Sequence, residues 1–178
     1  FKMHDKSKFE LYAFSYSTNA ESKIRLRIQK SFDEFIDVSN HGDKQITLMS
    51  REKNIDIAID LSGHTKNSRP SIFAMRAAPI QINFLGYPGT TGASYIDYNI
   101  SDKFIIPKEL LKYYSEKIIY LPKCYQPNEE KIIPGTKVFS RRSEGLPDSG
   151  FVFCCFNNSW KITPQIFKVW IRLLLSVD

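Results

Sequence analysis

The sequence lacks most of the features that identify a protein at first reading. It has no run of about 18 apolar residues, so it predicts no membrane-spanning helix. It also has no nucleophile elbow, no paired-cysteine metal site and no HExxH segment, which argues against the enzyme classes that these motifs identify. The opening letters, FKMHDKSKFE, are too charged for the apolar part of a signal peptide. These absences favour a cytoplasmic protein.

Cysteine is scarce, and the spacing of Cys124, Cys154 and Cys155 fits no metal site. The adjacent pair lies in the run FVFCCFN, where consecutive side chains of a strand would point to opposite faces. We therefore expect buried free thiols in a reducing compartment, with no disulfide and no bound metal.

Acidic residues are fewer than basic ones, which gives the chain a formal net charge of +6. A basic chain is compatible with nucleic-acid binding. The lysines are, however, spread along the sequence, and most lie beside Glu or Asp, as in SREKN and NEEK. This pattern favours an ordinary lysine-rich surface, and we expect no nucleic-acid partner.

What the sequence does contain is a regular alternation of strand and helix patterns. The segments predicted as strands are residues 9–17, 35–39, 55–63, 80–86, 95–102 and 117–122. Residues 55–63, IDIAIDLSG, give the clearest pattern of a buried strand. The alternation predicts an α/β fold in which a mostly parallel sheet carries helices on both faces.

The helix patterns between these strands have recognisable starts. In ESKIRLRIQKSFDEF the apolar residues Ile24, Ile28, Phe32 and Phe35 form one stripe of a predicted helix. Asp43 is placed to cap the helix KQITLMSREK.

Two further helices are predicted in the same unit. Pro70 suits the first turn of a helix over SIFAMRAA, with Ser68 nearby as a cap. A short helix is expected to start near Pro107, over KELLKYY.

The character of the chain changes between Lys123 and Gly150, where prolines, glycines and charges predict a linker. After it, GFVFCCFNNS predicts a strand, and KITPQIFKVWIRLLLSVD predicts a helix with Thr163 and Pro164 in its first turn. We interpret residues 1–148 as one domain with its linker and residues 149–178 as the start of a second α/β domain. Since the helix pattern still runs at the last residue, we expect a fragment of a longer protein.

Two loops follow predicted strands at the edge where parallel sheets bind ligands. The first, DLSGHTKNSRP, brings together His64, Thr65, Lys66 and Arg69, which can bind an anion or a sugar hydroxyl. A lone histidine also fits an ordinary hydrogen-bonded loop, and this alternative stays open.

The second loop, FLGYPGTTG, is rich in glycine. Gly86, Gly89 and Gly92 can adopt positive φ or allow a ligand to touch the main chain, and Pro88 stiffens the turn between them. The spacing matches neither the dinucleotide fingerprint nor the Walker phosphate loop. Taken alone, a cluster of glycines and a proline is more often a structural turn than a ligand site.

The combination of motifs is more specific than its parts. The segments DIAIDLSGHTKNSR, FAMRAAPIQINFLGYPGTTGASYIDYNISD, YYSEKIIYLP and FCCFNNSWKITP occur in this order. Together they resemble the catalytic region of the O-linked N-acetylglucosamine transferase family, which includes the SPINDLY-like proteins (glycosyltransferase family 41). The resemblance covers nearly the whole chain.

The resemblance implies a fold and a reaction. Members have two Rossmann-like halves with the active site between them, the arrangement called GT-B. They transfer a sugar from a nucleotide diphosphate donor to protein Ser or Thr hydroxyls, with inversion and without a required metal. For this chain it implies the later part of the N-terminal half and the start of the C-terminal half. It also implies UDP-linked N-acetylglucosamine as donor and a protein as acceptor.

The resemblance also assigns site residues. Leu85, Gly86, Tyr87 and Pro88 correspond to the segment that lies against the donor sugar, which predicts that the glycines make room for a hexose. His64, Thr65, Lys66 and Arg69 would form the neighbouring cleft wall. No residue of this chain receives a catalytic role, because the family's histidine, in a segment reading DFxxHP, would precede Phe1.

Two readings of the whole protein remain. It is an inverting protein O-glycosyltransferase of which this fragment alone is inactive, or it is a non-catalytic binding module that keeps the fold. Tetratricopeptide repeats are expected elsewhere in the parent protein.

Overall fold

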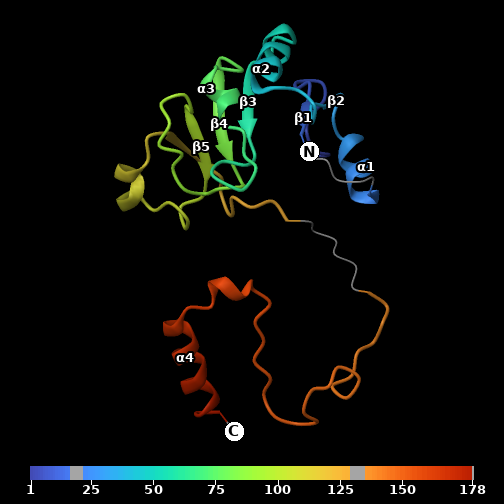
Figure 1. Cartoon of the computed structure of the whole chain (residues 1–178), viewed down its shortest axis with the longest axis vertical. Coiled ribbons are helices and arrows are strands. Elements are labelled where there is room, and N and C mark those ends of the chain that lie inside the picture. The colour runs from blue at the N-terminus through green and yellow to red at the C-terminus, as the bar shows by residue number, and fades with distance from the viewer. Residues whose placement is uncertain (17–21, 129–134, 178) are drawn as a thin grey trace. The chain divides into compact units, whose positions relative to one another are not determined.

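The computed structural model describes residues 1–16, 22–128 and 135–177 (Figure 1). The chain divides into two compact units, Phe1–Asn128 and Glu129–Asp178, and we describe each by itself. The division lies inside the predicted linker and precedes the predicted boundary at residue 148.

The first unit begins with a small parallel sheet. Strand β1 (Tyr12–Ser15) pairs with β2 (Glu34–Asp37), and helix α1 (Lys23–Gln29) connects them. Both predicted strands are confirmed, although residue 17 lies outside the described part of the chain.

The predicted helix stripe ending at Phe35 is wrong, because α1 stops at Gln29 and Phe35 lies in β2 opposite Ala13. Phe32 instead contacts the ring of Phe1, with centroids 4.8 Å apart. Strand pairing and ring packing therefore override the helical spacing of the phenylalanines.

A second sheet contains four strands in the order β3, β4, β5 and β6. Their bounds are Ile57–Asp60, Ile80–Phe84, Tyr98–Ser101 and Lys117–Tyr120. Every pair in it is parallel, which confirms the predicted parallel α/β fold.

The helices differ from the prediction mainly in their ends. Helix α2 spans Asp43–Glu52, and its N-cap is Gly42 rather than the predicted Asp43. The side chain of Gln45 accepts a hydrogen bond from the Gly42 N–H at 2.8 Å, which satisfies this end of the helix.

Two shorter helices complete the first unit. Helix α3 has only four residues, Ser71–Ala74, and begins after Pro70, not at the predicted cap Ser68. The helix predicted near Pro107 forms as a 3-10 helix, η1 (Lys108–Tyr113).

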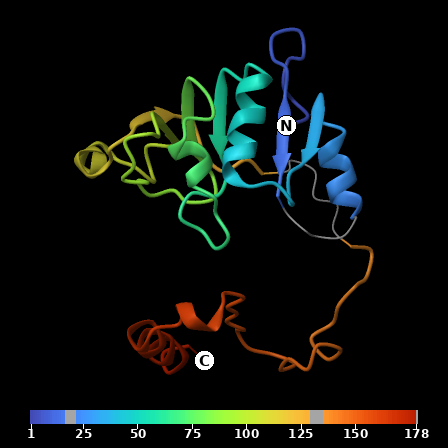
Figure 2. The ribbon, with the colours of Figure 1, turned by 45° about the horizontal axis from the view of Figure 1, so that its top comes forward.

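The core lies where α2 and α3 cover one face of the strands. Ile46 of α2 and Ile72 of α3 are buried together with Val38 and Ala77, and Ala58 of β3 packs against them. In the view of Figure 2, α2 lies between the two sheets. The helices therefore shield the side of β3 that carries Ala58 and Asp60.

The inward face of the second sheet is unexpectedly polar. Asp60, Asn83 and Asn99 are register partners across β3, β4 and β5, and each is at most 8% exposed. On the other face, Ile57 and Ile59 are 46% and 47% exposed. The prediction that residues 55–63 form a fully buried strand is therefore wrong for the described residues, in which no helix packs over the isoleucines.

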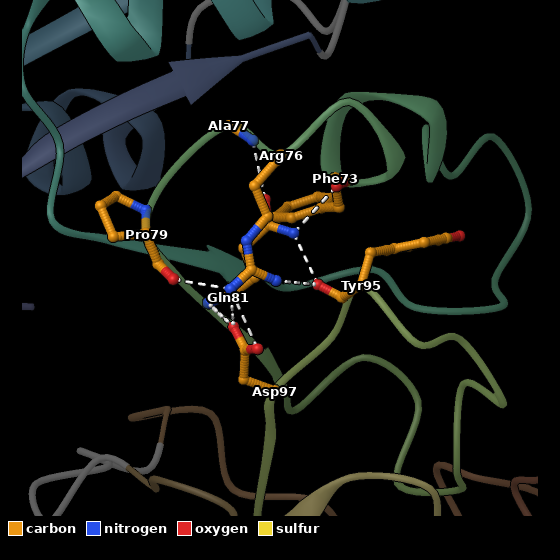
Figure 3. A network of polar contacts seen from close by, with 7 residues as sticks. All are labelled: Phe73, Arg76, Ala77, Pro79, Gln81, Tyr95 and Asp97. Atoms are coloured by element: carbon orange, nitrogen blue, oxygen red, sulfur yellow. Dashed lines mark hydrogen bonds and ion pairs between the residues drawn. The ribbon is translucent and has the colours of Figure 1, made fainter.

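Gln81, in β4, is the centre of the polar network drawn in Figure 3. Its amide nitrogen donates to the carbonyls of Phe73 and Tyr95 at 2.8 and 2.7 Å, and its oxygen accepts from the Ala77 N–H at 2.8 Å. All three polar positions of this fully buried side chain are thus satisfied by main-chain groups.

An arginine and an aspartate extend this network. Arg76, in the left-handed region with φ 60°, donates to both carboxylate oxygens of Asp97 at 3.0 and 2.8 Å (Figure 3). Asp97 also accepts the N–H of Gln81 at 2.8 Å. The network ties the segment after α3 to the residues that lead into β5.

The second unit contains little regular structure. A 3-10 helix, η2 (Ser159–Lys161), precedes helix α4 (Pro164–Leu174), and the hydroxyl of Thr163 caps α4 by accepting from the Ile166 N–H. The predicted helix and its first turn are confirmed.

The predicted strand over GFVFCCFNNS is not formed in the described residues. The segment makes no ladder there, because no second strand lies beside it to supply hydrogen bonds. Cys154 and Cys155 are consequently exposed, as is Cys124 in the first unit, so the expectation of buried thiols is wrong.

Among the described helices, none combines the length and apolarity needed to cross a membrane.

The network predicts a stability effect at Gln81. We expect Gln81→Leu to lower the free energy of unfolding by about 1–3 kcal/mol, because it leaves the buried Ala77 N–H without a partner and removes one of the two hydrogen bonds accepted by each of the Phe73 and Tyr95 carbonyls. Thermal unfolding of the full-length protein measures this as a lower Tm. Gln126→Leu, at an exposed position, is the matched control. Equal Tm values for the two variants would contradict the assigned role.

Candidate functional site

The two loops singled out in the sequence meet at the carboxyl edge of the second sheet. One follows β3 and carries His64; the other, residues 85–92, follows β4 and is called the glycine loop below. The His64 Nε2 lies 2.8 Å from the Thr91 carbonyl oxygen, and its ring packs edge-on against Tyr87 at 5.4 Å. The predicted juxtaposition of the loops is therefore present in the structure.

The glycines are explained by contacts within the protein. A Cβ on Gly86 would meet the main chain of the neighbouring loop, 2.9 Å from the Leu61 carbonyl carbon and 3.0 Å from the Ser62 Cα. A Cβ on Gly89 would lie 2.8–2.9 Å from the ring of Tyr87. The space that we expected for a hexose at these two positions is thus occupied by the chain's own atoms.

The glycine loop begins with a strained turn. Leu85 has φ 76°, a value that side-chain-bearing residues rarely adopt, and the Gly86 N–H donates to the Phe84 carbonyl at 3.0 Å. This bond closes a three-residue turn of the γ type, whose positive-φ form is costly. The surrounding contacts therefore hold Leu85 in a backbone conformation that it would rarely adopt on its own.

Three successive carbonyls of the loop are each bound by a different side chain. The Asn83 amide donates to Tyr87 O at 2.9 Å, the Tyr114 hydroxyl to Pro88 O at 3.1 Å, and the Asn99 amide to Gly89 O at 3.1 Å. These donors come from β4, from β5 and from the segment between η1 and β6. The polar face of the sheet thus acts as a platform beneath the loop.

A buried carboxylate holds the other half of the loop. Glu116, 5% exposed, accepts hydrogen bonds from the Thr90 hydroxyl at 2.7 Å, from the Thr91 N–H at 2.6 Å and from the Thr91 hydroxyl. Burial raises the pKa of Glu116, but the hydrogen bonds from Thr91 and Thr90 outweigh it, so the pKa lies below its ordinary value. The carboxyl is therefore ionised at neutral pH.

Some main-chain N–H groups of the glycine loop have no hydrogen-bond partner. Within the described residues, the N–H groups of Tyr87, Gly89 and Thr90 form no hydrogen bond. Because the carbonyls of residues 87–89 each already accept a hydrogen bond, this part of the main chain offers mainly donors. Such an arrangement suits a ligand that brings acceptor oxygens.

The predicted cleft-wall residues have different surroundings. His64, Thr65 and Lys66 are exposed, and in the described structure Lys66 has no ion-pair partner. Arg69 instead donates to Asp43 at 2.6 Å and to the His41 carbonyl at 2.6 Å. Its guanidinium therefore joins the loop to α2.

The cavity between the loops is small. It has a volume of about 10 Å³ and is lined by residues that include His64 and Thr91, which is room for a single water. The cavity is therefore too small for a sugar. A larger groove of about 590 Å³ is lined mainly by apolar side chains, including Ile57, Ile59 and Phe84. His4, Glu10 and Asp60 also line it, but apolar side chains predominate.

Sequence reasoning found both loops but missed the residues that support them. Asn83 and Asn99 lie within predicted strands and gave no motif, and Glu116 entered only as a letter of the YSEK run. No three His, Cys, Asp or Glu side chains come together as a metal site in the described ranges.

Comparison with known proteins gives a consistent match. The Glycosyl transferase family 41 model matches residues 1–133 and 126–178. A protein of Arabidopsis thaliana, named probable UDP-N-acetylglucosamine-peptide N-acetylglucosaminyltransferase SEC, is 39% identical over 183 residues, covering 99% of this chain. A SPINDLY protein of Eustoma exaltatum subsp. russellianum with the same probable activity in its name is 36% identical over 98% of this chain.

A solved structure agrees with these relatives. A mutant of the O-GlcNAc transferase of Thermobaculum terrenum superposes with a TM-score of 0.86 and 29% identity, over 98% of this chain and 32% of that one. The chain spans 19% of the length of the two curated relatives.

The geometry predicts that Gly86 is needed for folding. We expect Gly86→Ala to lower the free energy of unfolding by about 1–3 kcal/mol, because the added methyl overpacks the Leu61–Ser62 main chain. Urea unfolding of the full-length protein measures the change. Gly135→Ala, where a Cβ meets no atom within 4 Å, is the control, and a Gly86→Ala variant as stable as this control would refute the packing role.

Proposed function

Because the chain belongs to glycosyl transferase family 41, we propose that the full-length protein transfers a sugar from a nucleotide diphosphate donor to Ser and Thr hydroxyls of other proteins. The proposed donor is UDP-N-acetylglucosamine, the nucleotide sugar in the names of the curated relatives. The observation that carries the proposal is the family match over both units, joined to two loops that meet at the ligand-binding edge of a parallel sheet.

In the proposed reaction the acceptor hydroxyl oxygen attacks the anomeric carbon of the sugar. The bond from that carbon to the diphosphate oxygen breaks with inversion, the nucleoside diphosphate leaves, and the hydroxyl proton passes to a base. No residue of this chain is assigned as that base. The chain's part is to bind and orient the sugar, which lowers the entropic cost of bringing the reactants together.

The segment Leu85–Pro88 is proposed to lie against the donor sugar. The unbonded N–H groups of Tyr87 and Gly89 are suited to acceptor oxygens of the sugar nucleotide. Since the Thr91 carbonyl can only accept, the Nε2 of His64 donates to it, and the Nδ1 of the same ring is proposed to contact a ligand hydroxyl.

The cations of the first loop are proposed to divide two tasks. Lys66, exposed and without an ion-pair partner in the described structure, faces the diphosphate, with Thr65 beside it. Arg69 supports the cleft wall through Asp43. We propose that such cations and main-chain donors, without a metal or other cofactor, stabilise the leaving diphosphate.

The experiment that tests the function uses the full-length protein with a panel of nucleotide sugars and a mixed pool of acceptor proteins. Mass spectrometry is expected to find N-acetylhexosamine added to Ser and Thr with the UDP-linked donor. Heat-inactivated protein is the control. Nucleotide binding without addition from any donor would favour a non-catalytic binding module instead. Addition of another sugar would correct only the donor.

The division of tasks predicts that Lys66 affects donor binding and that Arg69 affects stability. We expect Lys66→Ala to raise the KM for the donor about tenfold, the effect of about 1.4 kcal/mol, with Tm unchanged. Arg69→Ala is expected to lower Tm by a few degrees, because it leaves a half-buried Asp43 without its partner. Lys30→Ala, an exposed lysine at the end of α1, is the control. Equal donor KM values for Lys66→Ala and Lys30→Ala would contradict the assignment.

A further inference from the structure

Glu116 is the most unusual polar group of the first unit. It precedes β6, far along the chain from the glycine loop, yet the hydrogen bonds of its carboxylate in the described structure all come from Thr90 and Thr91. It is buried and ionised, and no Lys or Arg of the described residues pairs with it. Its charge is therefore stabilised by the donors of the loop.

Burying the carboxylate of Glu116 costs more free energy than a simple turn would. A buried carboxylate without a cation loses its hydration, and only well-placed donors offset that loss. The Thr90 hydroxyl also accepts the N–H of Gly92 at 3.0 Å, which carries the ordering along the loop. A carboxylate in this position accepts from three donors at once, which fixes both threonines of the loop.

The anchor decides which groups of the loop remain available. Glu116 turns the Thr91 N–H and both threonine hydroxyls inward, while Asn83, Asn99 and Tyr114 occupy the carbonyls of residues 87–89. The N–H groups of residues 87, 89 and 90 are what is left for a ligand. Without the anchor, the inward donors would compete with them for the same acceptors.

We propose that Glu116 is a positioning residue for the donor: it holds the glycine loop in the conformation in which the N–H groups of Tyr87, Gly89 and Thr90 meet acceptor oxygens of the sugar nucleotide. The proposal rests on the proposed transfer from a nucleotide sugar. Glu116 touches no reacting atom, and its effect passes through Thr90 and Thr91. A merely structural glutamate would change stability without changing how the sugar is recognised.

The test compares two ligands on the full-length protein. Calorimetry gives the Kd for UDP-N-acetylglucosamine and for UDP alone in the wild type, Glu116→Ala, Glu116→Gln and Glu109→Ala. Glu109 is an exposed glutamate of η1 and serves as the matched control. Hydrogen–deuterium exchange of a peptide spanning residues 87–93 reports the order of the loop directly.

We expect Glu116→Ala to speed exchange in the loop and to weaken sugar-nucleotide binding about tenfold while UDP binding stays unchanged. Glu116→Gln is expected to keep most of the affinity, because its amide oxygen can still accept from the Thr91 N–H and hydroxyl. Glu109→Ala is expected to match the wild type in every measurement.

Two results would overturn the proposal, and they differ in what else they affect. An unchanged ratio of the two Kd values in Glu116→Ala, in a wild type that transfers sugar, removes the positioning role and leaves the proposed function intact. A wild type that neither binds nor transfers any sugar nucleotide removes both.

If Glu116→Ala does not fold, Thr91→Val carries the same comparison, because it removes one hydroxyl donor and keeps the main-chain bond to Glu116. Weaker sugar-nucleotide binding with unchanged UDP binding then supports the proposal, and an unchanged ratio overturns it.

Discussion

The polar row across the second sheet is the constraint on which the site depends. Asp60, Asn83 and Asn99 lie side by side on three parallel strands, on the face that faces inward. The side-chain NH2 groups of Asn83 and Asn99 donate to main-chain carbonyls of the loop after β4, and the carboxylate of Asp60 accepts the N–H of Ser62 in the loop after β3. The loops therefore fold back over the sheet instead of extending into solvent. A strained Leu85 and closely packed Gly86 are tolerated because this bonding determines the path of the chain.

The sequence contained enough information to predict the strands of the first unit and their parallel arrangement, but not which face would be buried. Local runs of isoleucine in β3 and β4 identify strands, since branched apolar residues favour extended structure. The usual rule then assigns the isoleucines to the interior, whereas Ile57 and Ile59 are exposed in the described unit. The alternating Asn and Gln of β4 point to the other face, and their burial becomes visible only once the covering loops are placed.

The two loops of the candidate site could be predicted from the sequence, but the residues that hold them in place could not. Positions at the ends of neighbouring parallel strands follow from topology, so the meeting of His64 with Thr91 was within reach. The contact of Glu116 with Thr91 joins residues 25 positions apart, and no local pattern reports it. The spacing of the glycines also indicates only that side chains are excluded at these positions, not which atoms exclude them. At Gly86 the structure identifies the neighbouring main chain as the reason.

The charged side chains near the loops are mostly paired, so the first unit is better suited to recognising the shape of a sugar than to neutralising the charge of a diphosphate. Two arginines near the loops are engaged, Arg69 by Asp43 and Arg76 by Asp97, and the carboxylate of Glu116 is satisfied by the loop itself. What the first unit offers a ligand at this edge is a set of neutral N–H groups, a histidine and the amine of Lys66. Neutral donors in fixed positions discriminate between sugars by where their oxygens lie, whereas a diphosphate needs full positive charge. On the proposed function, this unit therefore contributes mainly to holding and selecting the sugar, and Lys66 is the cation of these loops that stays available to the diphosphate.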